Sequence, residues 1–257
     1  MLMLYFSGTG NSKFIAELFS RNMNVKCHSI EEKLDFDKLI AAEEVLAFCY
    51  PVYGSMVPRI MREFVERYMA SLENKKIIIF CTQLIFSGDG SRVFAGAFPR
   101  GFVEVVYAEH FFMPNNVYNV FLLPHETERK IKKYIKKAER KMELVCSKIR
   151  AGIIKKRGFN VVSRILGLSQ RVFMPILERN ARAMDSVKVN NDCVQCRLCV
   201  SICPMNNLEY QDGKIAHRSN CTICCRCVNS CPEKAITVLF HGKVKRQYRG
   251  LGKSEQV

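Results

Sequence analysis

The sequence contains no tryptophan, few acidic residues and no long apolar run. Its 257 residues include 24 Asp and Glu against 40 Lys and Arg, which gives a formal net charge of +16. No stretch reaches the roughly 18 consecutive apolar residues of a membrane-spanning helix, so we expect no membrane span. The opening residues, MLMLYF, contain neither a basic leader region nor a cleavage site, which predicts a cytoplasmic protein.

The histidines and carboxylates show no arrangement typical of a general acid or base. The five histidines are scattered along the chain, and no pair of carboxylates stands out. We therefore assign no catalytic residues from the sequence.

Eight of the 13 cysteines form two runs of identical spacing. The first run reads C-x2-C-x2-C-x3-C before Pro204, and the second repeats it 28 residues later before Pro232. Each run is typical of a [4Fe–4S] site, and in two-cluster ferredoxins the fourth Cys of each run ligates the other cluster. We therefore predict a first cluster held by Cys193, Cys196, Cys199 and Cys231, and a second held by Cys221, Cys224, Cys227 and Cys203.

Two other uses of these cysteines fit the sequence less well. Zinc sites favour pairs of cysteines rather than four within eleven residues. A disulfide framework would suit a secreted protein, and nothing in the sequence indicates secretion. Cys225 interrupts the spacing of the second run, and we interpret it as an additional thiol and not as a ligand.

The N-terminal half of the chain alternates between buried-strand and helix patterns. Apolar runs predict five strands, at residues 1–6, 25–30, 45–49, 76–81 and 101–108. Helical spacing predicts helices at residues 13–22, 58–69 and 90–98. This alternation is typical of an α/β fold with a doubly wound, five-stranded parallel sheet.

The remainder divides into three parts after this α/β domain, which we place at 1–124. Residues 125–185 predict a basic helical segment that packs on or links the domains, with a helix at 126–152 and another at 160–182 interrupted by Pro175. Residues 186–240 contain both cysteine runs and predict a small α+β domain. Residues 241–257 are basic, and we expect them to form a flexible tail.

A loop rich in glycine and hydroxyl groups lies between the first predicted strand and the first helix. Its residues are Ser7, Gly8, Thr9, Gly10, Asn11 and Ser12. Backbone N–H groups at the start of a helix bind phosphate well. The loop lacks the third glycine of a dinucleotide loop and the GK[ST] ending of a Walker loop, so it suits a terminal monophosphate best.

The S-x-T-G-N-S sequence of this loop resembles the FMN phosphate loop of flavodoxins, T-x-T-G-N-T. Two more loops follow the third and fourth predicted strands, where a flavodoxin sheet contacts its flavin. The resemblance therefore implies an FMN site that also includes Pro51, Val52, Tyr53, Gly54, Thr82, Gln83, Leu84, Ser87, Gly88 and Asp89. It implies that Tyr53 lies against the isoalloxazine, although without tryptophan the Trp–Tyr sandwich of many flavodoxins cannot form.

Residues 186–240 resemble bacterial two-cluster ferredoxins, with Arg197 and Cys225 in place of the usual glycine after the second Cys of each run. A flavodoxin-like domain followed by a 2[4Fe–4S] ferredoxin domain resembles the fused flavodoxin–ferredoxin proteins of anaerobic bacteria and archaea. The resemblance implies an electron-transfer protein with one FMN and two [4Fe–4S] clusters. Its basic helices would then face redox partner proteins with acidic docking surfaces.

Two other functions remain open at this point. A flavin-dependent reductase fed by its own clusters would need a substrate pocket, which the loop Met113–Asn116 could shape. A nucleic-acid binder could use the Lys and Arg runs, but these lack interleaved aromatic residues, so we do not expect nucleic acid as a partner.

Overall fold

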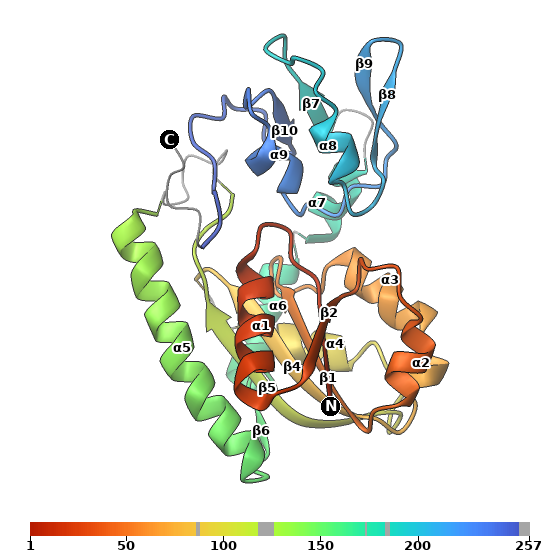
Figure 1. The fold of residues 1–257 in the computed structure, drawn as a ribbon, viewed down its shortest axis with the longest axis vertical. Coiled ribbons are helices and arrows are strands. Elements are labelled where there is room, and N and C mark those ends of the chain that lie inside the picture. Colours follow the sequence, from red (N-terminus) through yellow and green to blue (C-terminus); the bar gives the residue numbers. More distant parts are fainter. Residues whose placement is uncertain (86–87, 118–125, 173, 183–185, 252–257) are drawn as a thin grey trace.

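The computed structural model describes residues 1–85, 88–117, 126–172, 174–182 and 186–251. It consists of an N-terminal α/β domain and a smaller C-terminal module (residues 186–251) that stands over one end of the sheet (Figure 1). Among the described residues, no helix has both the length and the apolar character needed to cross a bilayer.

The N-terminal domain alternates strands with helices, as the sequence predicts. Its elements are β1 (Leu2–Tyr5), α1 (Asn11–Met23), β2 (Lys26–Ser29), α2 (Phe36–Ala41), β3 (Val45–Pro51), α3 (Arg59–Arg67), the 3-10 helix η1 (Ala70–Leu72), β4 (Lys76–Gln83), α4 (Gly90–Ala95), β5 (Glu104–Phe112), α5 (Glu128–Arg150) and β6 (Lys155–Lys156). Two connecting helices follow, α6 (Val161–Arg171) and α7 (Met174–Ala181). The C-terminal module contains β7 (Val187–Val189), α8 (Leu198–Ser201), β8 (Leu208–Gln211), β9 (Lys214–His217), α9 (Arg226–Ser230) and β10 (Ile236–Val238).

The sheet has the strand order β2-β1-β3-β4-β5-β6, and every neighbouring pair is parallel. This order confirms a doubly wound α/β fold, in which the chain runs outward from β1 in both directions. Both faces of the sheet are covered. Helices α1 and α5 pack on one face through Phe19, Met142 and Val145, and α2, α3 and α4 pack on the other (Figure 1).

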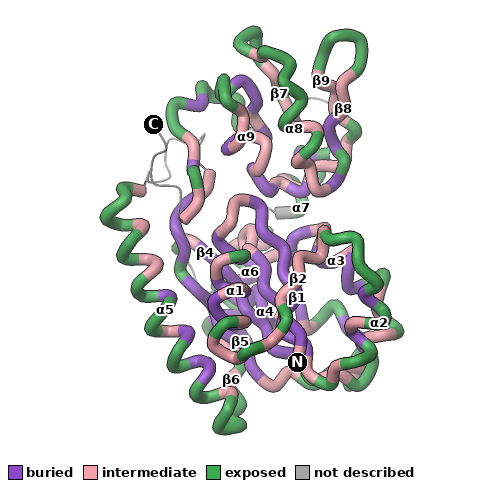
Figure 2. Tube along the Cα trace, viewed as in Figure 1, coloured by how far each residue is buried: buried purple, intermediate pink, exposed green. Residues whose placement is uncertain are grey.

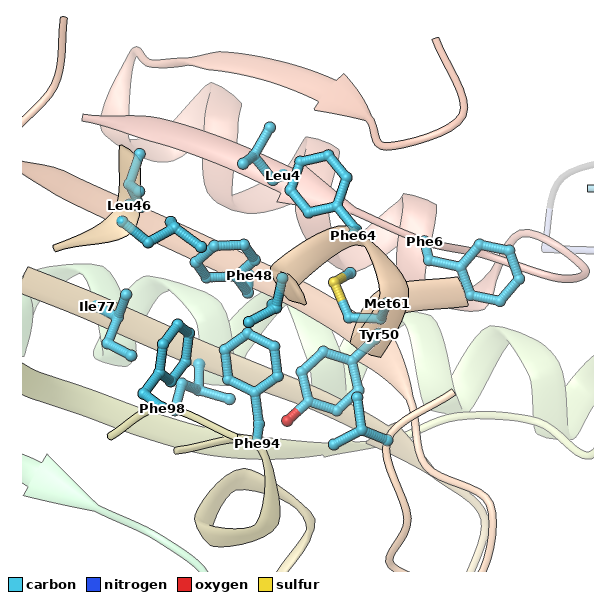
Figure 3. Packing of buried hydrophobic residues seen from close by; sticks show 14 of the residues in the cluster. Leu4, Phe6, Leu46, Phe48, Tyr50, Met61, Phe64, Ile77, Phe94 and Phe98 are labelled. Atoms are coloured by element: carbon cyan, nitrogen blue, oxygen red, sulfur yellow. The ribbon is translucent and has the colours of Figure 1, made fainter. Parts of the chain in front are cut away.

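The core between the sheet and α2–α4 is rich in aromatic side chains. Phe48 and Tyr50 of β3 pack against Phe94 of α4, with ring centroids 5.0 Å and 5.1 Å apart (Figure 3). The buried residues form one continuous band through the middle of the domain, while the outer faces of α2 and α5 are exposed (Figure 2). Each helix turns its apolar face toward the sheet, so its inner side is buried and its outer side is exposed.

The prediction of five strands was wrong, because the sheet has six. The sixth strand, β6, consists of two lysines, and no apolar pattern announces it. Tyr107 and Ala108 of β5 pair with Lys155 and Lys156 in parallel register. Lys155 forms an ion pair with Glu109 of β5. This ion pair provides the attraction that burial of apolar side chains usually provides in a strand.

Glu109 is a buried carboxylate, 1% exposed, that is surrounded by three cations. Its oxygens lie 2.7 Å from Lys155 Nζ, 2.9 Å from Lys141 Nζ and 3.3 Å from Arg157. Burial acts to raise the pKa of Glu109, but the hydrogen bond from Lys155 and the charge of Lys141 overcome it and lower the pKa to about 2. One carboxylate thus joins β5 to α5 and to β6.

The C-terminal module is an internal repeat in structure as well as in sequence. Its first strand, β7, pairs antiparallel with its last, β10, and β8 pairs antiparallel with β9. Left-handed backbone conformations occur at corresponding positions of the two halves, at Gln195 and Ile223, Arg197 and Cys225, and Asn206 and Lys234. The two halves therefore have similar backbone conformations, and the strands of one half pair with the strands of the other.

Two side chains of the C-terminal segment, for which the sequence predicts a flexible tail from residue 241, are buried against the rest of the protein. Val244 and Tyr248 are each 3% exposed. Gln247 donates hydrogen bonds to the backbone carbonyls of Val228 and Cys231. This part of the tail is held in place by polar contacts that a basic sequence does not reveal.

Replacing Glu109 with Gln tests the buried ion cluster. Removing one partner of a buried ion pair costs about 3 kcal/mol, which for a chain of this size lowers the melting temperature by roughly 6–12 °C. Because the pKa of Glu109 falls from 4.5 to about 2 on folding, the carboxylate stabilises the fold above pH 4.5. Above that pH, thermal unfolding should show the whole difference in melting temperature between wild type and Glu109→Gln.

The gap should close as the pH falls toward 2, because the wild-type carboxylate then becomes protonated. Glu104→Gln, at the exposed start of the same strand, is the matched control and should melt within about 1 °C of wild type. A gap that does not change with pH would contradict the role given to the charge of Glu109.

Candidate functional site

A cavity of about 350 Å³ lies where the C-terminal module meets the carboxyl ends of the sheet strands. Ligands of open α/β sheets bind at this edge. Three loops of the N-terminal domain line it, and they contain most of the predicted FMN contacts: Ser7, Gly8, Thr9, Asn11, Ser12, Pro51, Val52, Tyr53, Gly54, Thr82, Gln83 and Leu84.

The first loop presents the start of α1 to the cavity. Gly10 has a φ of 102°, a conformation that favours glycine, and its N–H donates to Ser7 Oγ over 3.0 Å. No side chain caps the N-terminus of α1. The first N–H groups of α1 and the positive end of its dipole are therefore the groups that an anion at this loop would meet.

The polar side chains of this loop are already engaged with other parts of the protein. Asn11 donates to the carbonyl of Pro114 over 2.9 Å and accepts from the Tyr248 hydroxyl over 2.6 Å. Ser12 Oγ lies 2.7 Å from Thr82 Oγ1, which joins the first loop to the third. The side chains thus fix the shape of the loop, and the backbone N–H groups are left to face a ligand.

The second and third loops place buried polar atoms in the cavity. The Gln83 side chain is 6% exposed, and neither its amide nitrogen nor its amide oxygen has a hydrogen-bond partner among the described residues. The same holds for the Tyr53 hydroxyl, and burial together with the neighbouring Cys224 raises the pKa of Tyr53 well above its usual value. Buried polar groups are normally hydrogen-bonded, so these atoms are available to a molecule bound in the cavity.

Three described residues that were predicted for this site, Gly10, Gly88 and Asp89, do not line the cavity. Gly10 shapes the loop without lining the cavity, and Gly88 packs against Ser55. Asp89 is fully buried and forms ion pairs with Arg92 and Arg171. Ser87 lies outside the described residues.

Other residues line the cavity that the flavin-site prediction did not include. The loop 113–117 after β5, Leu177 of α7 and, from the C-terminal module, Ile223, Cys225 and residues 238–240 all contact it. The turn residues at 113–116 are visible in the sequence, where they suggest a pocket wall. Contacts from the C-terminal module could not be predicted, because they depend on how the two parts of the chain pack.

The eight cysteines of the two runs are grouped around two further cavities. One is lined by Cys193, Cys196, Cys199 and Cys231, and the other by Cys203, Cys221, Cys224 and Cys227, with Cys225 beside them. Each group contains three thiols of one run and the last thiol of the other. Within the described part of the chain, no three or more His, Cys, Asp or Glu converge closely enough to hold a single metal ion.

Backbone N–H groups point at several of these sulfurs. The N–H of Asn207 donates to Cys203 Sγ over 3.3 Å, and the N–H of Ala235 donates to Cys231 Sγ over 3.3 Å, at the equivalent position of the repeat. Burial raises the pKa of Cys224 to about 12, so this thiol ionises readily only beside a positive charge such as a metal. The surroundings thus provide donors for sulfur ligands.

The C-terminal module approaches the phosphate-type loop closely. A Cβ atom on Gly8 would lie 2.4 Å from the carbonyl oxygen of Cys224, so only glycine fits there. Cys225 lines both the large cavity and the cavity of the second cysteine group. The two sites are therefore separated by little more than this segment of chain.

Arg226 holds this contact in place with all five of its N–H donors. Its guanidinium pairs with both oxygens of Glu31 over 2.7 Å each. Its remaining donors reach the backbone carbonyls of Gly8, Ser7 and Ile202 over 3.1, 2.8 and 3.0 Å. One arginine of the C-terminal module is thus hydrogen-bonded to the loop that precedes α1.

Asparagines and the tail add a second set of contacts on the other side of the loop. Asn229 donates to the carbonyl of Asn116 over 2.8 Å and accepts from the backbone N–H of Tyr248 over 2.7 Å. Asn116 in turn donates to Thr9 Oγ1 over 2.8 Å. Together with the bond from Tyr248 to Asn11, these contacts fix the C-terminal module against the loop from two directions.

Comparison with known proteins gives two matches to parts of this chain. A flavodoxin domain model matches residues 2–113. A ferredoxin of Methanothermococcus thermolithotrophicus is 46% identical over 46 residues, which are 17% of this chain and 77% of that ferredoxin. The chain therefore contains a flavodoxin domain and, through the 46-residue segment, belongs to the ferredoxin family.

Solved structures give more distant similarities. A flavodoxin from the domain Archaea matches with 16% identity and a TM-score of 0.37, over 58% of this chain and 97% of that one. Megasphaera elsdenii flavodoxin matches with 19% identity and a TM-score of 0.38, over 55% and 99%. General stress protein 14 of Treponema denticola, solved with FMN, matches with 11% identity and a TM-score of 0.43, over 57% and 96%. Similarities of this size carry no argument about the site.

Replacing Arg226 with Lys tests the contact between module and loop. Lysine keeps the charge but offers three donors in place of five and cannot pair with both oxygens of Glu31 at once. We expect amide hydrogen exchange in residues 7–12 to become about tenfold faster, which corresponds to a loss of about 1.4 kcal/mol.

Arg218→Lys is the matched control, because Arg218 forms a similar pair with Glu209 on the exposed surface of the same module. Surface pairs of this kind contribute little, so exchange in residues 7–12 should match wild type. Equal exchange in both variants would contradict the role of Arg226.

Proposed function

We propose that this chain is an electron-transfer protein that binds FMN in the large cavity and two [4Fe–4S] clusters in the C-terminal module. The observation that carries the proposal is that one cavity is lined both by the loop of Ser7–Ser12 and by Ile223 and Cys225 from the second cysteine run. When bound, FMN supplies a carrier that takes up two electrons and releases them singly, and each cluster carries one electron. The protein holds these groups next to each other.

The residues around the cavity fit FMN. The uncapped start of α1 suits its phosphate. The Gln83 amide offers one donor pair and one acceptor to the pyrimidine edge of an isoalloxazine, which presents both kinds of group. The volume of about 350 Å³ is near the lower end of ligand sites, roughly 300–1,000 Å³. We therefore expect the cofactor to fill most of the cavity and to leave little room for a substrate.

The cysteine groups fit two cubane clusters. Four thiols surround each of the two cavities, and backbone N–H groups donate to sulfurs at equivalent positions of the repeat. The left-handed backbone at Arg197 and Cys225 explains why related ferredoxins use glycine there. Both departures from glycine keep that backbone and add a side chain near the sulfurs.

The exposed face of α5 is the docking surface that we propose for a redox partner. It presents five cations that share one side of the helix and are all exposed: Lys132, Lys133, Lys136, Lys137 and Arg140. A partner with an acidic surface would be attracted to this face, and the encounter would slow as salt increases.

Cofactor analysis of anaerobically purified protein tests the proposal. We expect about eight iron and eight sulfide per chain, with one FMN. Gln83→Leu should weaken FMN binding about tenfold, because it removes hydrogen bonds inside a buried site, and should leave the iron content unchanged. Zinc in place of iron would rule out the clusters, and iron without FMN in the wild type would rule out the flavin site.

A pair of neighbouring substitutions tests which thiols are ligands. Cys224→Ser should lower the iron content by about four per chain. Cys225→Ser, one position later, should retain the full content and still transfer electrons from photoreduced flavin to the clusters. Loss of iron in Cys225→Ser would contradict the assignment, and steady turnover of a small molecule by the protein alone would favour a flavin-dependent reductase.

A further inference from the structure

Helix α6 is amphipathic, but it turns its polar face toward the protein and its apolar face outward, opposite to the usual surface helix. Ser55 Oγ donates to Gln170 over 2.6 Å, and Arg171 forms an ion pair with the buried Asp89. Gly167 lies so close to Asp89 that an added Cβ would be 1.7 Å from the carboxylate oxygen. The helix is therefore docked through hydrogen bonds, an ion pair and a glycine, and its apolar residues are not used for packing.

The outward face of α6 and the residue after it carry a stripe of aliphatic side chains. Val161, Ile165, Leu168 and Val172 are each at least 60% exposed, and their spacing of four, three and four places them on one side of the helix. Val162, also on this helix, is 66% exposed. Contiguous exposed apolar residues on a folded protein indicate an interaction surface.

The chain segment that carries this stripe has charges of one sign. The sequence contains no Asp or Glu from residue 144 to residue 177. Arg164 lies on the exposed side of α6, and Lys156 is exposed just before it. The surface that covers the stripe must therefore be apolar within and negatively charged at its boundary.

An anionic lipid surface fits these requirements better than a protein does. The stripe consists of Val, Ile and Leu, whereas the cores of protein interfaces are enriched in Tyr, Trp, Phe and Met. A second copy of the chain, with a formal net charge of +16 and the same cations beside the stripe, would be repelled. Helices with basic residues beside a bulky apolar face lie in the plane of a membrane surface.

We propose that α6 docks the protein on an anionic lipid surface, with the stripe in the boundary between headgroups and acyl chains. Arg164 and Lys156 then meet the negatively charged headgroups. The polar contacts to Ser55 and Asp89 hold the helix against the protein while its apolar face is in the lipid. This proposal is independent of the cofactors.

Sedimentation of the full-length holoprotein with vesicles tests the proposal. We expect binding to vesicles of phosphatidylcholine with phosphatidylglycerol, and weaker binding to phosphatidylcholine alone or at high salt. The double substitution Ile165→Ser with Leu168→Ser should weaken binding to the anionic vesicles about tenfold or more, because two apolar side chains no longer enter the lipid. Arg164→Glu should weaken it as well, without changing the stripe.

Leu144→Ser is the matched control, since Leu144 is 64% exposed on α5 and belongs to a different surface. It should bind vesicles as wild type does. A melting temperature equal to that of wild type in each variant would show that the fold is retained. The proposal is wrong if wild type does not sediment with anionic vesicles, or if the double variant binds as tightly as wild type. It is also wrong if light scattering shows that wild type is a dimer and the double variant is a monomer, while neither protein binds vesicles.

Discussion

Arg226 connects the two parts of the chain at the point where the large cavity and the cavity of the second cysteine group meet. Its five donors are all used, and two of its acceptors are carbonyls of the loop that starts α1. It follows Cys225 directly and precedes Cys227, so the position of the second cysteine run is tied to the position of that loop. The geometry of the large cavity depends on this contact, because its walls come from both sides of it.

A second polar anchor organises the far edge of the sheet. Glu109 forms ion pairs with Lys141, Lys155 and Arg157, and the strand β6 lies where Lys155 can reach that carboxylate. Asp89 has the same role for α6, through Arg171. In both places a buried carboxylate positions a basic segment, so part of the positive charge of the chain is structural and not available for partners.

The sequence was sufficient for features that depend on local pattern. Apolar runs predicted β1 to β5. The cysteine spacing sorted eight thiols into the same two sets that line separate cavities, and their role as cluster ligands stays a prediction. The sequence failed where a distant charge decides the structure, as at β6, and where two segments far apart in sequence meet. Tyr248, in a basic stretch without any motif, contacts Asn11 only because the tail returns to the first loop. Asp89 resembled a flavin contact in sequence and is an ion-pair partner in the structure.

Gly8 occupies the variable position of the phosphate-loop pattern, the x of S-x-T-G-N-S. In a flavodoxin domain standing alone, that position can carry a side chain. Here the carbonyl of Cys224 occupies the space. A loop with a larger residue at this position would therefore collide with the Cys224 carbonyl and force the two parts of this protein apart. Glycine at position 8, which the motif leaves unspecified, is thus required by the packing of the C-terminal module.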